Sequence, residues 1–122
     1  MDASFPGSRR RFVVNVIELA PGSTSAVNGI EIATWEADHP SGAPPPVLRL
    51  GLGDTTIAYT GDTAWTENLI PAADDADLLI AEAYYYDKPI PYHLRYSDLI
   101  THRASLTSRR TMLSHMFRRH AR

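Results

Sequence analysis

Two short apolar runs flank a Gly-Asp dipeptide near the middle of the chain. Residues 47–52 and 55–60 are rich in apolar or β-branched side chains, and Gly53 and Asp54 lie between them. A Gly-Asp pair between two such runs is a hairpin signal, because both residues tolerate the backbone of a tight two-residue turn. The pattern therefore predicts two paired strands and requires that the chain builds a sheet.

The flanking segments predict how this sheet is extended. Apolar and β-branched runs predict further strands over residues 11–19, 29–38, 77–83 and 110–116. Helices are predicted over residues 63–74, with Thr63 as N-cap and Pro71 as an interruption, and from the capping Ser97 to residue 106. Four prolines predict a loop over residues 39–46. The order β-β-β-β-α-β-α-β predicts an α/β domain over residues 11–116, between a flexible segment 1–10 and a basic tail 117–122.

The composition restricts the classes of function. The chain has 122 residues, a net charge of −2 and no cysteine, so it is about one domain in size and cannot form disulfides or thiolate metal sites. A metal ion would have to be held by His, Asp or Glu. No stretch approaches about 18 apolar residues, so no membrane span is expected. The start lacks a secretory pattern, so the expected location is the cytoplasm.

Three possible metal ligands follow three different predicted strands. They are His39, Asp62 and His115. Ligands of α/β proteins gather at the carboxyl ends of strands, where rigid strand ends can hold side chains at metal-binding distances. Each residue also has a simpler interpretation when it is taken alone. Asp62 after Gly61 could stabilise a turn or cap a helix, His39 could be a solvated loop residue, and His115 could be a core histidine with one hydrogen bond.

Three longer segments carry a family resemblance. They are "EADHPSGAPPPVLRL" from residue 36, "IAYTGDTAWTENLI" from residue 57 and "ADLLIAEAYYYDKPIPYHLRYSDLITHRASLTSRRTMLSHM" from residue 76. In this order they resemble the C-terminal half of metallo-β-lactamase-fold hydrolases, in the branch that includes ribonuclease Z-like proteins. The resemblance implies a partial αββα sandwich and metal-dependent hydrolysis of phosphodiester or ester substrates.

The resemblance also implies roles for individual residues. His39 and His115 fall at metal-binding histidines, and Asp62 falls at the carboxylate that bridges two metal ions. His93 falls near a histidine that protonates the leaving group, and Glu82 falls at an acidic residue that would orient it. The implied cofactor is zinc in a two-metal site, with manganese or iron as alternatives. The tips of His39, Asp62 and His115 are expected within about 5–6 Å of one another.

The chain departs from the family pattern at one point. The family builds most of its metal site from a His-x-His-x-Asp-His segment, and no two histidines here are separated by a single residue. The expected protein is therefore a truncated or split form that is inactive alone. Its expected partner is a complementary N-terminal half or a second copy, which would cover an apolar sheet face formed by Trp35, Ile57, Tyr59 and Leu79. The alternative is a non-catalytic interaction module or an RNA-binding remnant, with weak nucleic-acid binding through the arginine-rich tail.

Overall fold

The computed structural model describes residues 11–40 and 46–116. The predicted flexible segment 1–10, the predicted basic tail 117–122 and part of the predicted loop lie outside the described residues. Within the described part, no helix is long and apolar enough to cross a membrane.

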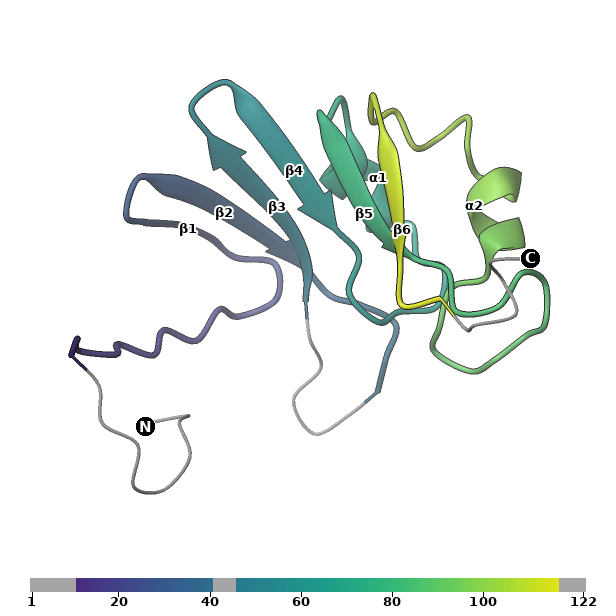
Figure 1. Cartoon of the computed structure of the whole chain (residues 1–122), viewed down its shortest axis with the longest axis horizontal. Helices are drawn as coiled ribbons and strands as arrows, with labels where there is room; N and C mark the ends of the chain where they lie inside the picture. The colour runs from purple at the N-terminus through teal and green to yellow at the C-terminus, as the bar shows by residue number, and fades with distance from the viewer. Residues whose placement is uncertain (1–10, 41–45, 117–122) are drawn as a thin grey trace.

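The described residues form one six-stranded sheet whose strands lie in the order of the sequence (Figure 1). The strands are β1 (Thr24–Val27), β2 (Ile30–Trp35), β3 (Val47–Leu52), β4 (Thr55–Tyr59), β5 (Leu78–Glu82) and β6 (Thr111–Ser114). The first four strands pair antiparallel, whereas β4, β5 and β6 run parallel to one another. Helices α1 (Leu69–Ala73) and α2 (Tyr96–Thr101) lie in the two connections between the parallel strands. The predicted α/β class and element order are confirmed.

The prediction for the first strand was wrong. Residues 11–20 form no strand, and Phe12 and Val13 are exposed. The first strand is instead β1, which pairs with β2 across Asn28 and Gly29, both of which have positive φ angles. An Asn-Gly turn of this kind fixes the register of a hairpin. This turn brings β1 beside β2, whereas residues 11–20 pair with no strand among the described residues.

Both helices are shorter than predicted. Thr63 does not cap a helix, because α1 begins at Leu69 with Asn68 as its N-cap residue. Pro71 lies in the first turn of α1, where its missing N–H would have no partner within the helix. Helix α2 ends at Thr101, and the Asp98 carboxylate accepts the backbone N–H of Arg95 at its start (2.9 Å). This hydrogen bond satisfies one of the donors that the first helical turn leaves free.

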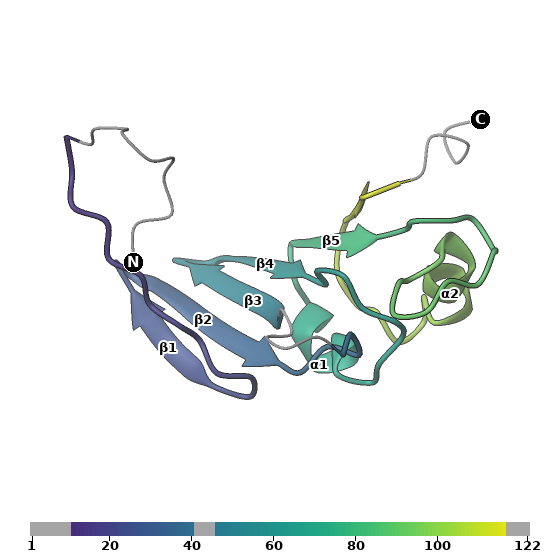
Figure 2. The same ribbon diagram turned by 90° about the horizontal axis from the view of Figure 1, so that it is seen from below.

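The core lies between the sheet and α1, which covers one face of the sheet (Figure 2). Small side chains dominate it, so the helix can approach the strands closely. Its buried members include Val47, Ala58, Leu69, Ala72, Ala73, Leu79 and Ala81. The guanidinium of Arg49 donates from Nη1 to the carbonyls of Ala72 (2.9 Å) and Asp74 (2.7 Å). A cation at this helix end satisfies carbonyls that have no partner in the helix and complements its dipole.

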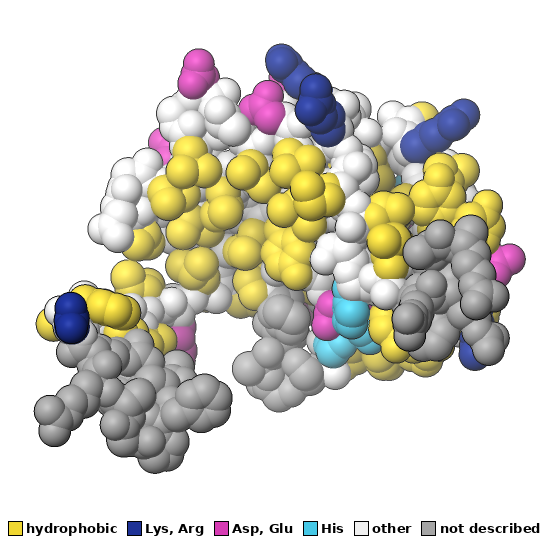
Figure 3. Space-filling view, in the orientation of Figure 1, with side chains coloured by type: hydrophobic (Ala, Val, Ile, Leu, Met, Phe, Trp, Pro, Cys, Tyr) yellow, Lys and Arg dark blue, Asp and Glu magenta, His cyan; other side chains and the backbone are white. Residues whose placement is uncertain are grey.

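The opposite face of the sheet is apolar and largely uncovered. Register places Leu50 beside Ile57 and Ile57 beside Leu78 across three neighbouring strands, and none of these three side chains is fully buried. Figure 3 shows hydrophobic side chains gathered on this side. Ile57 and Tyr59 were placed here correctly, but Trp35 and Leu79 were not. Trp35 packs against the core and Leu79 is buried in it, because alternate residues of a strand point to opposite faces.

Candidate metal centre

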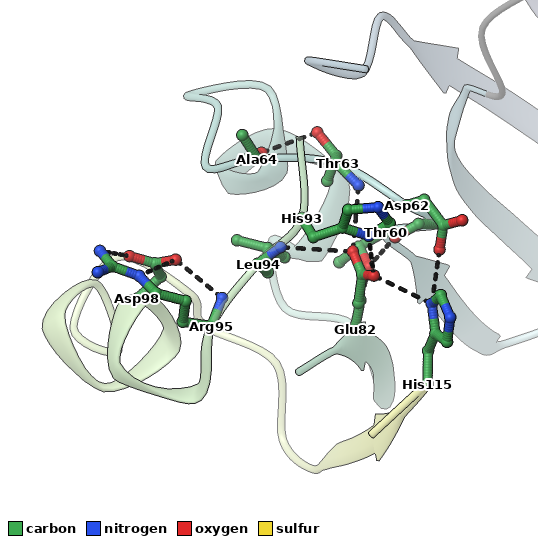
Figure 4. Close-up of polar contacts among 11 residues, drawn as sticks. Thr60, Asp62, Thr63, Ala64, Glu82, His93, Leu94, Arg95, Asp98 and His115 are labelled. Carbon is green, nitrogen blue, oxygen red and sulfur yellow. Dashed lines mark hydrogen bonds and ion pairs between the residues drawn. The ribbon is translucent and has the colours of Figure 1, made fainter. Parts of the chain in front are cut away.

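Four ligand-type side chains meet at one end of the parallel strands (Figure 4). Asp62, Glu82, His93 and His115 each offer one ligand atom, and these atoms all lie within 4.8 Å of one another. Glu82 is the last residue of β5 and His115 follows β6 directly. Asp62 comes shortly after β4, and His93 lies in the connection between β5 and α2.

Parallel pairing explains why three of these residues share an edge. Strands β4, β5 and β6 run in the same direction, so their carboxyl ends lie together. Backbone hydrogen bonds continue each ladder beyond the strands, from Thr60 N to the Ile80 carbonyl (3.0 Å) and from Ala83 N to the Ser114 carbonyl (3.1 Å). Gly61 then turns the chain with a φ of 60°, a conformation that glycine adopts without steric cost. Asp62 follows this turn and points back into the group (Figure 4).

Glu82 is the buried centre of the group. It is only 2% exposed, and its two oxygens divide their contacts. Oε1 faces Nδ1 of His93 and lies 3.0 Å from Nδ1 of His115. Oε2 accepts the backbone N–H groups of Thr63 (3.3 Å) and Leu94 (3.4 Å). A buried carboxylate is costly unless it is fully hydrogen-bonded, and these contacts fulfil that condition.

The contacts of Glu82 also fix the orientation of two imidazole rings. An ionised carboxylate only accepts hydrogen bonds, so the contacts with Glu82 and Asp62 correspond to the tautomers in which Nδ1 of His93 and Nδ1 of His115 carry the protons. In the neutral rings, both Nε2 atoms then hold a free lone pair. Holding Nδ1–H on a carboxylate is the usual way in which proteins orient a metal-binding or proton-transferring histidine.

Asp62 and His115 form the open side of the group. Oδ1 of Asp62 lies 3.0 Å from Nδ1 of His115, and the two side chains are 41% and 48% exposed. This contact and the start of α1 at Leu69 exclude the interpretation of Asp62 as a helix cap. His115 has a φ of 54°, a left-handed conformation that costs a bulky residue of order 1 kcal/mol or more. Such strain persists only where the surrounding contacts hold the residue in place.

His39 lies beside the group but outside its four members. Its ring centroid is 5.5 Å from that of His93 and 6.1 Å from that of Tyr92. Its Nδ1 is buried and has no hydrogen-bond partner among the residues that the structure describes. The structure thus brings Asp62 and His115 into direct contact and places His39 beside His93. The roles of all five residues as ligands or catalysts stay predictions.

Two threonines hold the site together, and the sequence interpretation missed both functions. The Thr60 hydroxyl accepts the backbone N–H of Glu82 (3.1 Å) and so ties β4 to the end of β5. The Thr63 hydroxyl accepts the backbone N–H of Asp38 (2.8 Å), the residue before His39. The segment "TGDT" contains both threonines around Asp62, but its spacing alone does not reveal their partners.

The donor set fits a metal ion. Imidazole nitrogens and carboxylate oxygens are ligands of zinc, manganese and iron, and the orphaned Nδ1 of His39 is a buried polar atom that a ligand would satisfy. The two half-exposed members leave an open side through which an ion and a substrate could enter.

Comparisons with known proteins point to one family. The model of the beta-lactamase superfamily domain matches residues 2–116. A probable metallo-hydrolase of Bacillus subtilis strain 168, YhfI, is 41% identical over 39 residues, which are 32% of this chain and 16% of that protein.

Solved structures share the fold over most of the chain. The crystal structure of YhfI, a metallo-beta-lactamase fold protein, matches with a TM-score of 0.73 at 22% identity and covers 82% of this chain and 42% of YhfI. The short form of human tRNase Z matches with a TM-score of 0.64 at 18% identity and covers 79% of this chain and 39% of that one. Igni18, a metallo hydrolase from Ignicoccus hospitalis, gives 0.66 at 14% identity, with 81% and 44% covered. This chain therefore spans less than half the length of these structures. It belongs to the family described by the beta-lactamase superfamily domain model and has a partial metallo-β-lactamase fold.

Proposed function

We propose that this chain contributes one half of a metal-dependent hydrolase site. The observation that carries the proposal is the meeting of Asp62, Glu82, His93 and His115 at the carboxyl ends of the parallel strands. Asp62, His115 and the orphaned His39 would hold the metal. Zinc is the first candidate, and manganese or iron is the alternative.

Glu82 and His93 serve a different purpose in this proposal. Glu82 is buried and already uses both of its oxygens, so it acts as a positioning residue for His93. His93 is 20% exposed and can present its other nitrogen, Nε2, to a substrate oxygen. In its protonated form it would donate that proton to the leaving oxygen. A metal ion bound here would supply Lewis acidity and an activated water.

The substrate class is the finer part of the proposal. Hydrolysis of phosphodiester or ester bonds requires an activated water and a proton donor on the leaving-group side, and the site offers residues for both. The related structures include a metallo hydrolase and a tRNase Z, and each supports hydrolysis as the reaction type. The chain has no His-x-His-x-Asp-His segment. We therefore expect it to bind metal but to need further ligands from a partner for turnover.

A metal titration tests this proposal. We expect zinc or manganese to bind the wild-type chain in isothermal titration calorimetry, and Asp62→Asn to weaken binding by at least about tenfold. The matched control is Asp54→Asn, which removes a carboxylate from the β3–β4 turn at the opposite end of β4 and should leave the affinity unchanged. Equal affinities for the two variants would refute the proposed ligand role of Asp62.

Activity assays of the metal-loaded chain address the second half of the proposal. Bis(4-nitrophenyl) phosphate and 4-nitrophenyl acetate should be hydrolysed no faster by wild type than by Asp62→Asn. A metal-dependent rate that is lost in Asp62→Asn would show that this chain completes the site by itself or as a dimer.

The uncovered sheet face favours a second candidate function, that of an interaction module. Leu50, Ile57 and Leu78 form a continuous apolar strip across three strands, and Tyr59 on the same face is 40% exposed. A monomeric protein rarely leaves a large apolar patch unpaired. The proposed occupant is a complementary half-domain or a second copy that presents an apolar sheet face of its own.

A further inference from the structure

A groove lies directly beside His93, on the side of the connection between β5 and α2. Its volume is about 630 Å³, and its walls come from Trp65 and from the loop segment Pro89, Ile90, Pro91 and Tyr92. His93 lines the same groove and also belongs to the candidate metal centre. A group that occupies the groove would therefore sit next to any bond that is broken at that centre.

The groove offers no free charge among the residues that are described as lining it. Arg95 and Asp98 are its only other ionisable members besides Tyr92 and His93. Arg95 donates from Nε and Nη2 to the two oxygens of Asp98 (3.2 and 2.8 Å) and from Nη1 to the Asp87 carbonyl (3.2 Å). A guanidinium engaged in this way has little capacity to recruit a phosphate. A polyanionic ligand such as a nucleic-acid strand would gain little attraction here.

The remaining walls are flat and rigid. Trp65 is stacked on His102 with ring centroids 3.6 Å apart and an angle of 2° between the planes, which fixes the orientation of the indole. Two proline rings restrict the facing loop. Aromatic and proline surfaces of this kind suit a planar apolar group, because ring faces make large contacts at low entropy cost.

Tyr92 supplies an independent observation. Its backbone has a φ of 65°, a left-handed conformation that is unfavourable for an aromatic residue, and its side chain is 44% exposed. Tyr92 therefore combines a strained backbone with partial exposure, although its ring also contacts that of His39. Glycine or asparagine would satisfy the same turn at lower cost. A ligand contact of the Tyr92 ring, which lines the groove next to His93, would explain why an aromatic residue occupies this turn.

We propose that this groove binds an uncharged planar group of the substrate, such as an aromatic ring, attached next to the bond that is hydrolysed. The inference rests on the proposed function for its link to catalysis. Binding in the groove itself needs no metal. It narrows the substrate class to esters or phosphodiesters that carry at least one apolar ring.

The test uses the metal-free chain and 2-naphthol as an uncharged aromatic probe. Two-dimensional ¹H–¹⁵N NMR separates the indole N–H signals of Trp65 and Trp35, the two tryptophans of the chain. We expect 2-naphthol to shift the Trp65 signal in a saturable manner and to leave Trp35, which is not part of the groove wall, unchanged. We expect 2-naphthyl phosphate, which has the same ring with added negative charge, to bind no more tightly.

Variants locate the binding site. Tyr92→Gly removes the ring while it relieves the strained backbone, and we expect it to weaken 2-naphthol binding at least fivefold with an unshifted Trp35 signal as evidence of folding. The control, Tyr86→Ala, removes a tyrosine that is 61% exposed and lies outside the groove, and it should bind as wild type does. An unmoved Trp65 signal, wild-type affinity in Tyr92→Gly, or tenfold tighter binding of the phosphate would each overturn the proposal. The 2-naphthol experiment contains no metal, so its outcome and that of the metal titration are independent. A failure of 2-naphthol binding refutes the groove proposal alone, and a failure of metal binding refutes the proposed metal site alone.

Discussion

Replacement of Thr63 by valine should loosen the connection between the two segments that carry His39 and Asp62. Thr63 is fully buried, and its hydroxyl accepts the Asp38 N–H and donates to the Ala64 carbonyl, both at 2.8 Å. Valine has nearly the same shape, so the change leaves no cavity but removes both hydrogen bonds. Each lost bond costs about 0.5–1.5 kcal/mol, and a buried group without a partner costs more. We therefore expect the free energy of unfolding to fall by about 2 kcal/mol.

Urea denaturation measures this loss. With a slope of about 2 kcal/mol/M, the midpoint should fall by about 1 M. Thr63→Ser is the matched control, because it keeps the hydroxyl and loses one methyl group, which is worth about 1 kcal/mol. Amide hydrogen exchange separates the two effects, since Asp38 N–H should lose its protection in the valine variant and keep it in the serine variant. An Asp38 amide that stays protected in Thr63→Val, or an unchanged urea midpoint, would refute the role of this hydroxyl.

Two further predictions concern α2 and the uncovered sheet face. Burial by itself raises the pKa of Asp98, but hydrogen bonds from Arg95 and its charge outweigh this, so the pKa lies below its ordinary value. A lowered pKa in the folded state adds stability that is present above about pH 4 and is lost as the pH falls through the folded pKa. Asp98→Asn should therefore have a lower free energy of unfolding than wild type at pH 7, and this difference should disappear in acid. A difference in the free energy of unfolding that stays constant from pH 7 to pH 2 would contradict this prediction. Wild type should self-associate with rising concentration in sedimentation equilibrium, and Ile57→Lys should abolish this association. Thr101→Lys, on the exposed end of α2, should not affect it. A wild-type chain that stays monomeric would argue against a dimer through the sheet face.

The sequence was informative where local chemistry dominates. Gly53 and Asp54 mark a hairpin because few residues fit a tight turn, and the structure has the β3–β4 hairpin at that position. The parallel strands are recognisable in the sequence as apolar runs, so the positions at which these strands end can also be predicted. For this reason the sequence predicts that Asp62 and His115 lie at the same edge of the sheet. The same reasoning failed for residues 11–19, whose propensity for strand is not matched by a partner strand.

The sequence by itself determined the element order and the fold class, because turn residues and periodic apolar runs act over a few neighbouring positions, and it predicted which side chains could bind metal. The tertiary structure decided which of those side chains meet. Glu82 is the buried centre because the ends of β4, β5 and β6 and the His93 loop surround it. The contacts within this group join residues that are far apart in the sequence, from 11 positions for Glu82 and His93 to 53 positions for Asp62 and His115. His39 lies beside His93. The Thr63 hydroxyl accepts the backbone N–H of Asp38 instead of capping the predicted helix. Long-range contacts of this kind depend on how the strands pair and how the loops close, and no local pattern encodes them.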